Sequence, residues 1–465
     1  MARARRIRTR SAARLPDRIE QVLLVTMGAL IGVGLMVGGS ATDRPPGFFL
    51  VSVLSAAALG VAIWRLLQAP DKRDNLALAL CLTIVIVPLV QLIPLPAAVW
   101  ERLPGRDLAV QSANLVQAAD AHRALSLTPG ETFAAIGWLL APVAAFLATM
   151  AIGPRARRWL VGLYLLGAAL GVLLGLYEIY LGPDRTPLPY EFMNAGLPTG
   201  FFANRNHQAA GLALAIVLAA GWVHGAERDQ NGRDLAPRYV FLGLAALYTA
   251  GALATLSRAG VILLTLAIFS SVMLLAADPI RRRLGRTTSY WLLAAGAILA
   301  ALLALGLQPV LARFDAVATE SRLEFWPPLL DAAHSFFPWG SGLGSFRSIA
   351  NAALPVELLS PAYVNEAHNE YVQLWMEAGV AFPLLLLGFL SWLARQAARG
   401  SKAGLDGLQV MALTGIGLLL LHSFFDYPLR TPAMAIAFGI LCGLLTQPRS
   451  AGRRENAGDQ ATRDR

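Results

Sequence analysis

The sequence has few charged residues and almost no cysteine. Only 15% of its 465 residues are charged, and the mean hydropathy is +0.54, whereas about 25% of the residues of a soluble protein are charged. This shortage excludes an ordinary soluble domain. The two cysteines, Cys81 and Cys442, both fall in apolar stretches, so they predict neither a zinc site nor a disulfide.

Several motifs of catalytic and transport sites are also missing. There is no Walker A motif, which argues against a nucleotide-driven pump, and no G-x-S-x-G turn for a nucleophilic serine. The glycine-rich run Gly342-Leu-Gly-Ser-Phe346 is interpreted as loop geometry. Neither D-x-D nor H-E-x-x-H occurs, so we expect no obligatory metal and no cofactor.

The sequence is rich in apolar runs of about twenty residues, the length that crosses a bilayer. These runs predict an all-α polytopic membrane protein with about twelve transmembrane helices. The first run lacks a clean cleavage site, and we expect it to be retained rather than removed as a signal peptide. The predicted spans are residues 20–38, 47–67, 75–95, 131–152, 159–181, 206–224, 239–256, 259–277, 290–312, 379–395, 407–425 and 431–447.

Two local patterns add detail to these spans. Thr128-Pro-Gly-Glu131 has the form of a capping box with proline at the first helical position, and it predicts the start of the fourth span. The stripe Gly167-x-x-x-Gly171-x-x-x-Gly175 predicts close helix packing in the fifth.

The basic residues predict the orientation. A cytoplasmic N-terminus places 28 of the 39 lysines and arginines on the inner side and 11 on the outer side, as the positive-inside rule requires. We therefore interpret the N-terminal basic run as an orientation signal, not as a nucleic-acid site. The predicted parts are a cytoplasmic N-terminus (1–19), a transmembrane domain (20–447) and a cytoplasmic tail (448–465). Two long outer segments, about 96–130 and 313–378, are of a size that is usually functional.

The scarce outer arginines and the histidines define candidate site residues. Asn204, Arg205, Asn206 and His207 open the sixth span, where free backbone N–H groups and the helix dipole favour an anion. Arg258, in the turn Ser257-Arg-Ala-Gly260, lies at or just inside the membrane boundary, where an arginine costs roughly 2.5–3.5 kcal/mol and usually faces a polar cavity. The alternatives are snorkelling at the interface for the first cluster and capping of the helix end by Arg258. Arg322 is a further outer arginine.

Two more clusters follow in the chain. In Glu366-Ala-His-Asn-Glu-Tyr371, His368 is the outer residue best suited to exchange a proton, with Asn369 and Tyr371 beside it. In the last cluster, Asp426 lies one helical turn after His422 and could orient a histidine or hold an arginine. A bystander histidine and plain interface placement remain the alternatives.

In order and content, these motifs resemble those of the bacterial O-antigen ligase/polymerase superfamily. The resembling runs are Asn204-Arg-Asn206, Ser257-Arg-Ala-Gly260, Gly340-Ser-Gly-Leu-Gly344, Ala367-His-Asn-Glu-Tyr371 and His422-x-x-x-Asp426, within about residues 195–430.

The resemblance implies a GT-C-like helical fold with a large periplasmic loop between spans nine and ten, in the bacterial inner membrane. It implies metal-independent transfer of a glycan from an undecaprenyl-diphosphate carrier to an acceptor hydroxyl at the periplasmic face. Arg205 and Arg258 then correspond to the diphosphate-binding arginines, His368 to the catalytic histidine and Asp426 to the acidic residue of the late span. The supporting residues would be Asn204, Asn206, His207, Asn369, Tyr371, His422 and Arg322.

The superfamily contains ligases that load lipid A–core, polymerases that extend glycans and oligosaccharyltransferases that modify protein. The motifs do not separate the three, and we favour a ligase or a polymerase. The expected partners are the carrier-linked donor, an acceptor (glycan, lipid A–core or protein) and membrane lipid, but no nucleic acid. A transporter or flippase and a membrane scaffold are the rival classes; transporters usually bind charge near mid-membrane in paired repeats, which this sequence lacks.

Overall fold

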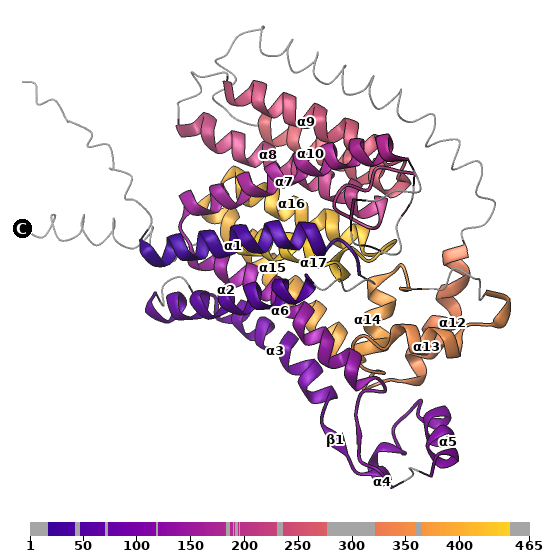
Figure 1. The fold of residues 1–465 in the computed structure, drawn as a ribbon. Helices are drawn as coiled ribbons and strands as arrows, with labels where there is room; N and C mark the ends of the chain where they lie inside the picture. Colours follow the sequence, from indigo (N-terminus) through magenta and orange to yellow (C-terminus); the bar gives the residue numbers. More distant parts are fainter. Residues whose placement is uncertain are drawn as a thin grey trace, which may run out of the picture.

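A computed structural model describes most of the chain, including the central residues of each motif. The described residues are 17–41, 47–69, 73–117, 120–182, 187–188, 190, 194, 196–229, 236–276, 321–358 and 365–446. Within them the fold is almost entirely α-helical (Figure 1).

Helices occupy the positions of eleven predicted spans; the ninth, 290–312, lies outside the described residues. Within the described residues, seven helices are long and apolar enough to cross a membrane. This is therefore a multi-pass membrane protein, while the count of twelve spans stays a prediction. The seven are α1 (Arg18–Val37), α2 (Phe48–Gln68), α6 (Pro129–Ala151), α7 (Pro154–Leu181), α8 (Arg205–Asp229), α10 (Arg258–Ala276) and α15 (Ala381–Ala403). The other four are α3 (Asn75–Gln91), α9 (Ala236–Ala254), α16 (Gly407–His422) and α17 (Pro432–Leu445).

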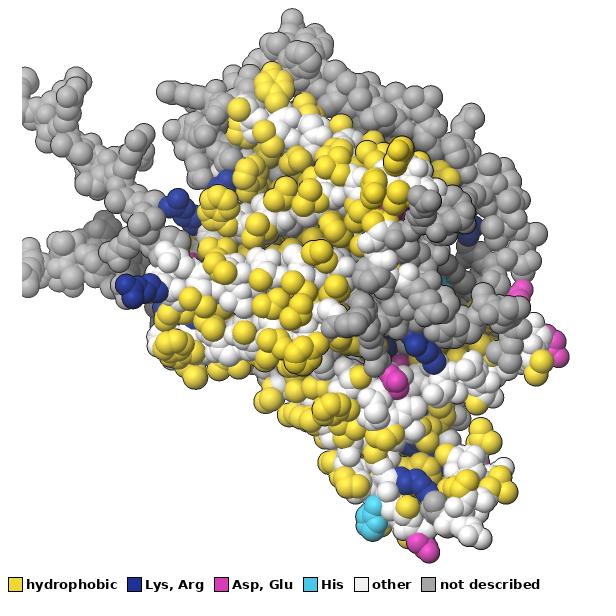
Figure 2. All heavy atoms as spheres, viewed as in Figure 1, with side chains coloured by type: hydrophobic (Ala, Val, Ile, Leu, Met, Phe, Trp, Pro, Cys, Tyr) yellow, Lys and Arg dark blue, Asp and Glu magenta, His cyan; other side chains and the backbone are white. Residues whose placement is uncertain are grey.

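The helices pack side by side, with α8 and α17 in the interior (Figure 1). Along α17 nearly every side chain is buried, and α8 contacts α7, α9, α10 and α16. Small residues allow this closeness: a Cβ on Gly443 of α17 would come within 2.5 Å of Thr149 of α6. Hydrophobic side chains spread over the helical face in Figure 2, as expected for a surface in contact with lipid.

The glycine stripe of α7 packs as the sequence predicts. A Cβ on Gly167 would meet Leu35 of α1 at 2.5 Å, and one on Gly175 would meet Pro198 at 2.9 Å. Because Gly171 in turn faces Gln208 of α8, the stripe lets α1 and the segment leading into α8 approach the α7 backbone closely.

The predicted capping box at the start of α6 does not form, because the Thr128 side chain lacks the expected hydrogen bond. The helix does begin at Pro129 with Thr128 as N-cap, but the Thr128 side chain makes no capping hydrogen bond. Instead Ser126 accepts from the Thr128 backbone N–H at 3.1 Å and pairs with the Thr132 hydroxyl at 2.7 Å. Ser126 therefore binds the Thr128 N–H, the donor that the pattern assigned to the Glu131 side chain.

The two long segments that the sequence predicts to lie outside the membrane contain helices of their own and pack together. The first contains β1 (Pro94–Leu95), α4 (Ala97–Trp100), α5 (Asp107–Leu115) and β2 (Arg123–Ala124), with β1 and β2 antiparallel. The described part of the second contains α12 (Ser321–Ser335), α13 (Phe346–Ala353), η3 (Val356–Leu358) and α14 (Glu370–Ala378). They meet where the Leu127 N–H donates to the Ser341 carbonyl at 2.9 Å. Gly340, Gly342 and Gly344 all have positive φ, which confirms loop geometry for this run.

Candidate functional site

The described candidate residues converge at one end of the bundle, where α7 ends and α8 and α10 begin; we call this the site end. Asp426, after α16, lies at the centre of the cluster with 0% exposure. Asn206 Nδ2 donates to its Oδ2 at 2.8 Å, Asn204 Nδ2 lies 3.3 Å from the same oxygen, and the Tyr427 N–H donates to Oδ1 at 3.0 Å. A buried carboxylate is costly unless it is hydrogen-bonded, so these donors allow an ionised group here.

His368 reaches the same carboxylate from the loop before α14. Its Nδ1 lies 3.3 Å from Asp426 Oδ1, and its side chain keeps 18% exposure. The backbone of His368 has φ +49°, in the left-handed region that residues with side chains rarely occupy. Such conformations cluster at functional sites, where the surrounding structure holds them. Because Nδ1 faces Asp426, Nε2 is the ring nitrogen that faces away from the carboxylate.

Asn369 holds this loop against the start of α14. Its side-chain Oδ1 accepts from the N–H groups of Tyr371 and Val372 at 3.0 and 3.2 Å, as an N-cap does. The position of His368 is therefore tied to a helix start. Asn369 is a structural support of the histidine rather than a direct neighbour of Asp426.

His207 and His422 complete the buried part of the cluster. His207, in the first turn of α8, has its Nε2 3.6 Å from Asp426 Oδ1 and a side chain that is 1% exposed. Its ring lies 5.0 Å from that of Tyr427 and 6.1 Å from that of His422. Three histidines from three segments thus surround Asp426 and Tyr427.

The electrostatics of Asp426 follow from these neighbours. Burial alone would raise the pKa of Asp426, but the hydrogen bonds and charges of His207 and His368 hold it well below its usual range. These interactions favour the ionised carboxylate, which can orient an imidazole by accepting its N–H.

His207, His422 and Asp426 are also a possible metal ligand set. One ligand atom from each lies within 4.8 Å of the others, and all three residues are buried. Sequence reasoning missed this set because it searched for closely spaced ligands, and His207 is far from the other two in the chain. Both Asp426 oxygens already accept hydrogen bonds from protein donors, so the carboxylate is well satisfied without an ion.

Arg205 and Arg258 are the first residues of α8 and α10. The two helices start against each other, since a Cβ on Gly260 would come within 2.5 Å of the Ala209 side chain. The Arg205 N–H donates to Asn194 Oδ1 at 3.0 Å. Each helix N-terminus carries a partial positive charge. The two arginines therefore stand where two such N-termini meet, which is the setting of an anion site.

Ser257 connects this pair of helices to Asp426. Its hydroxyl donates to Asn206 Oδ1 at 2.8 Å and accepts from the Gly260 N–H at 2.9 Å. Asn206 in turn donates to Asp426. A continuous chain of hydrogen bonds thus runs from the first turn of α10 through α8 to the carboxylate that contacts His368.

Glu370 joins α14 to the segment that carries Asp426. Its carboxylate accepts from the Ser423 hydroxyl at 2.9 Å and from the Leu429 N–H at 2.7 Å, while its backbone N–H donates to the Ser423 carbonyl. Close by, Arg430 of η4 (Pro428–Arg430) pairs with the buried Glu377 at 2.8 Å. These bonds fix the His368 loop relative to Asp426.

Burial acts strongly on the carboxyl groups of this neighbourhood. It raises the pKa of Glu366 to about 7 and that of Glu370 to about 7, although the Arg430 charge opposes the rise in both. Gln373 donates to Glu366, and the Glu366 segment leads directly into His368. The loop before α14 therefore rests on two carboxyl groups that change charge near neutral pH.

Tyr371 contacts other residues than Asp426. The Tyr371 hydroxyl donates to the Leu420 carbonyl at 2.8 Å and its ring packs on Phe424, so it braces α14 against α16. Arg322 is the second residue of α12, but its side chain lies outside the described part of the chain. Sequence reasoning assigned no role to Ser257, Glu370 or Tyr427, although all three stand inside or beside motifs that it singled out.

A comparison with protein families gives a match to part of the chain. The model described as O-Antigen ligase matches residues 241–393. That stretch contains Ser257, Arg258 and His368, whereas Asn206 and Asp426 lie outside it. No curated protein matches the chain at a significant level.

Proposed function

The matched region supports membership of the O-antigen ligase/polymerase superfamily, and from this premise we propose that the protein is a metal-independent glycosyltransferase. It moves a glycan from an undecaprenyl-diphosphate carrier to an acceptor hydroxyl at the periplasmic face of the bacterial inner membrane. The observation that carries the proposal is the contact between His368 and Asp426, beside the first turns of two helices that begin with arginine.

His368 is the general base in this proposal. Asp426 accepts the N–H of Nδ1, which leaves Nε2 with the lone pair that takes a proton from the acceptor hydroxyl. The hydroxyl oxygen then attacks the anomeric carbon of the donor sugar as the bond from that carbon to the diphosphate oxygen breaks. The ionised Asp426 stabilises the imidazolium that forms, as a buried carboxylate can when it stays charged.

Arg205 and Arg258 stabilise the leaving diphosphate. Their guanidinium groups donate in pairs to phosphate oxygens, and the dipoles of the two helices add positive potential at the same place. Such donors are most effective when they are fixed before the charge develops. The contact of Gly260 with Ala209 and the bond from Ser257 to Asn206 supply that fixation. Two arginines can neutralise the leaving group without a metal.

The predicted orientation places this chemistry at the periplasmic face. The site end carries the scarce outer arginines, and the N-terminus of α1 lies at the opposite end of the bundle in Figure 1. A cytoplasmic N-terminus, as the basic residues predict, then puts the site end outside. The membrane-facing surfaces of the neighbouring helices would receive the hydrocarbon tail of the carrier.

The deciding experiment is transfer by the purified full-length protein from a defined undecaprenyl-diphosphate glycan. Lipid A–core, a second carrier-linked glycan and an acceptor protein are offered in parallel. We expect a glycosylated product with one of the first two, identifying a ligase or a polymerase. A protein product would identify an oligosaccharyltransferase. Movement of the intact carrier glycan across vesicles, with no product on any acceptor, would replace the proposal with a transporter.

A further inference from the structure

A groove runs between α1 and α7 at the end of the bundle opposite the site end, where both helices begin; we call this the inner end. The volume of the groove is about 410 Å³, within the range of pockets that hold a ligand. The residues that line it are Leu24, Val25, Gly28 and Ala29 of α1 and Arg155, Trp159 and Leu163 of α7. The lining therefore carries one charged group, the guanidinium of Arg155, and is otherwise mostly apolar.

Contacts between the two helices bound the groove at both ends. At its outer end a Cβ on Gly28 would lie 3.4 Å from Leu163, so the helix surfaces touch there. At its inner end the Glu20 carboxylate accepts from the Gly153 N–H at 2.5 Å. The α7 backbone rises about 12 Å from Arg155 to Leu163, which is most of the roughly 15 Å depth of one hydrocarbon leaflet. The groove is therefore long enough for a large part of one acyl chain.

The open side of the groove faces lipid. Val25 and Trp159, on its two walls, are exposed by 73% and 61%. Both belong to helices that are long and apolar enough to cross a membrane, so bilayer lipid is the molecule that contacts them. Because hydrocarbon chains are as apolar as these walls, apolar contact alone does not select one lipid over another. The selection depends on the charges at the inner end.

Two exposed arginines stand at the inner end. Arg155 is the second residue of α7 and lines the groove. Arg18 is the first residue of α1 and lies seven residues before Val25, which places it on the groove side of that helix. Neither arginine forms an ion pair in the part of the chain that the structure describes. Figure 2 shows basic side chains at this end of the bundle, next to the hydrophobic face.

The acids at the start of α1 do not cancel this positive charge. Asp17 is paired with Arg65 at 2.5 Å. Glu20 is bonded to the N–H before α7, and neither acid lines the groove. Even when Glu20 is counted against Arg18 and Arg155, the inner end keeps a net positive charge. A negatively charged head group is therefore favoured there.

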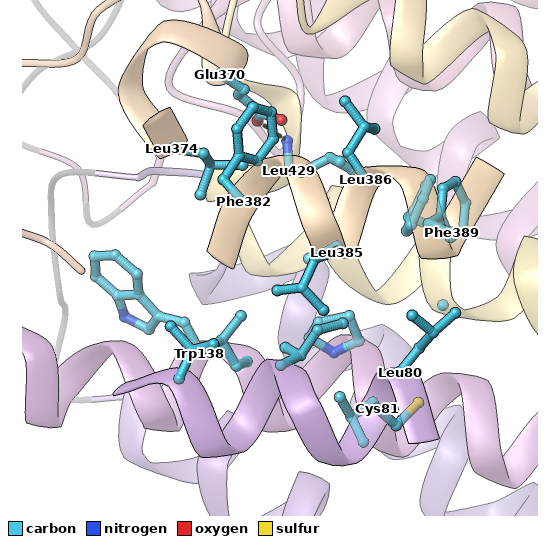
Figure 3. Close-up of a pocket in the computed structure, with 18 of the residues that line it drawn as sticks. Leu80, Cys81, Trp138, Glu370, Leu374, Phe382, Leu385, Leu386, Phe389 and Leu429 are labelled. Carbon is cyan, nitrogen blue, oxygen red and sulfur yellow. Dashed lines mark hydrogen bonds between the residues drawn. The ribbon is translucent and has the colours of Figure 1, made fainter. Parts of the chain in front are cut away.

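The apolar cavity among α3, α6, α14 and α15, drawn in Figure 3, lacks such a charge. Its charged lining residues are Glu370 and Arg430, which have opposite signs. Both Glu370 oxygens already accept hydrogen bonds, from the Ser423 hydroxyl and the Leu429 N–H. That cavity therefore selects no head group, whereas the groove between α1 and α7 favours an anion.

We propose that the groove between α1 and α7 binds an anionic phospholipid, with one acyl chain between the helices and the phosphate at Arg155 and Arg18. A guanidinium group donates paired hydrogen bonds to phosphate oxygens. Trp159, one turn deeper on α7, lies at the level where tryptophan favours the membrane–water interface. In the predicted orientation this is the cytoplasmic leaflet. The site is distinct from the proposed donor site, whose arginines begin α8 and α10 at the opposite end of the bundle.

The test is lipid binding by the purified full-length protein, which requires no glycan transfer and is therefore independent of the proposed function. The protein is delipidated in mild detergent and titrated with phosphatidylglycerol or phosphatidylethanolamine of identical acyl chains, with undecaprenyl phosphate as competitor. Native mass spectrometry counts the bound lipids.

Two variants alter the groove, and each has a matched control. Arg155→Gln removes the charge, and Arg395→Gln removes an exposed arginine at the inner end of α15. Ala29→Trp fills the groove, and Ala57→Trp places the same side chain at an exposed position of α2. The first pair separates a built site from the general attraction of basic residues for anionic lipid.

We expect the wild type and both controls to bind one phosphatidylglycerol, at least about fivefold more tightly than phosphatidylethanolamine. Arg155→Gln should lose about fivefold in its affinity for phosphatidylglycerol, with little change for phosphatidylethanolamine. Ala29→Trp should weaken both lipids by at least about tenfold. If that variant does not fold, the exposed Arg155→Gln decides.

Three outcomes would overturn the proposal. Equal affinities of the two lipids for the wild type would remove the role of the arginines. Equal losses in Arg155→Gln and Arg395→Gln, or in Ala29→Trp and Ala57→Trp, would show that the groove is not the site. Displacement of phosphatidylglycerol by an equal concentration of undecaprenyl phosphate, with the same dependence on Ala29, would assign the groove to the carrier instead.

Discussion

Asn206 and Asp426 stand 220 positions apart in the chain, yet a 2.8 Å hydrogen bond joins their side chains. Asn206 follows Arg205 directly, and it also accepts from Ser257, which precedes Arg258. Each proposed diphosphate arginine thus has a neighbour in the hydrogen-bond chain that ends at Asp426 and His368. This series of hydrogen bonds fixes the position of the proposed leaving-group site relative to the proposed base.

The first prediction concerns the hydrogen bonds that connect Ser257, Asn206 and Asp426. Asn206→Ala and Ser257→Ala should each lower the transfer rate by roughly 10–100-fold, the usual effect of losing a supporting hydrogen bond behind a reactive group. Donor affinity should change less than the rate, because neither side chain carries charge. Asn351→Ala, at an exposed asparagine of α13, is the control. Equal rates for the Asn206→Ala and control proteins would show that the chain has no part in transfer.

His368→Ala should lose roughly 10²–10⁴-fold in transfer rate while folding normally, because a positioned general base contributes about that much. Binding of the lipid-diphosphate donor should survive, since the histidine acts on the acceptor. His122→Ala removes an exposed histidine of the first outer segment and serves as the control. Loss of donor binding in the His368→Ala protein would instead make this residue part of the diphosphate site.

Arg205→Lys and Arg258→Lys keep the charge but lose the planar pair of donors. Each should weaken donor binding and transfer by roughly tenfold to a hundredfold, since a hydrogen bond to a charged group contributes about 1.5–3 kcal/mol. The exposed Arg102→Lys is the matched control. Normal rates for both lysine variants would mean that the two arginines are structural.

The fourth prediction is that transfer continues after exhaustive chelation. His207, His422 and Asp426 lie close enough to bind a metal, so the measurement must include the metal content of the purified protein. We expect substoichiometric metal and full activity in chelator. Activity that disappears with chelator and returns with zinc, magnesium or manganese would contradict the proposed mechanism, and a loss of bound metal in His422→Ala would then locate the ion.

The fifth prediction follows from Glu366, whose pKa is raised from 4.5 to about 7 by burial. The folded protein therefore binds more protons than the unfolded chain between these values, so stability falls as the pH rises through this window. One such group accounts for a loss on the order of 3 kcal/mol. Glu366→Gln should reduce the fall in apparent Tm between about pH 5 and 8. Glu357→Gln, at an exposed carboxylate, should behave as the wild type does. An unchanged pH dependence in the Glu366→Gln protein would contradict the assignment.

The sequence by itself determined which stretches form the long apolar helices and, within a few residues, where most of these begin and end. The helices within the two long segments, among them α5, α12 and α14, were not predicted. Apolar runs of bilayer length leave the backbone little alternative to a helix, because every N–H and C=O in lipid must be paired within the segment. Because most basic residues fall on the predicted inner side, the few arginines on the predicted outer side were candidates for a functional role. The structure places two of them, Arg205 and Arg258, at the first positions of α8 and α10. The local sequence pattern predicted side-chain hydrogen bonds less well. At the start of α6 the Thr128 side chain makes no capping hydrogen bond, and the Thr128 N–H donates to the Ser126 hydroxyl.

Only the tertiary structure decided which polar residues meet. Spacing along one helix suggested that Asp426 could pair with His422, but the contacts to Asn206 and His368 cross 220 and 58 positions. No periodicity encodes such pairs, because they depend on which helices pack together and on how far each is rotated. The positive φ of His368 and the bonds of Glu370 arise in the same way. Hydropathy fixes the depth of each residue in the membrane, whereas packing determines its neighbours.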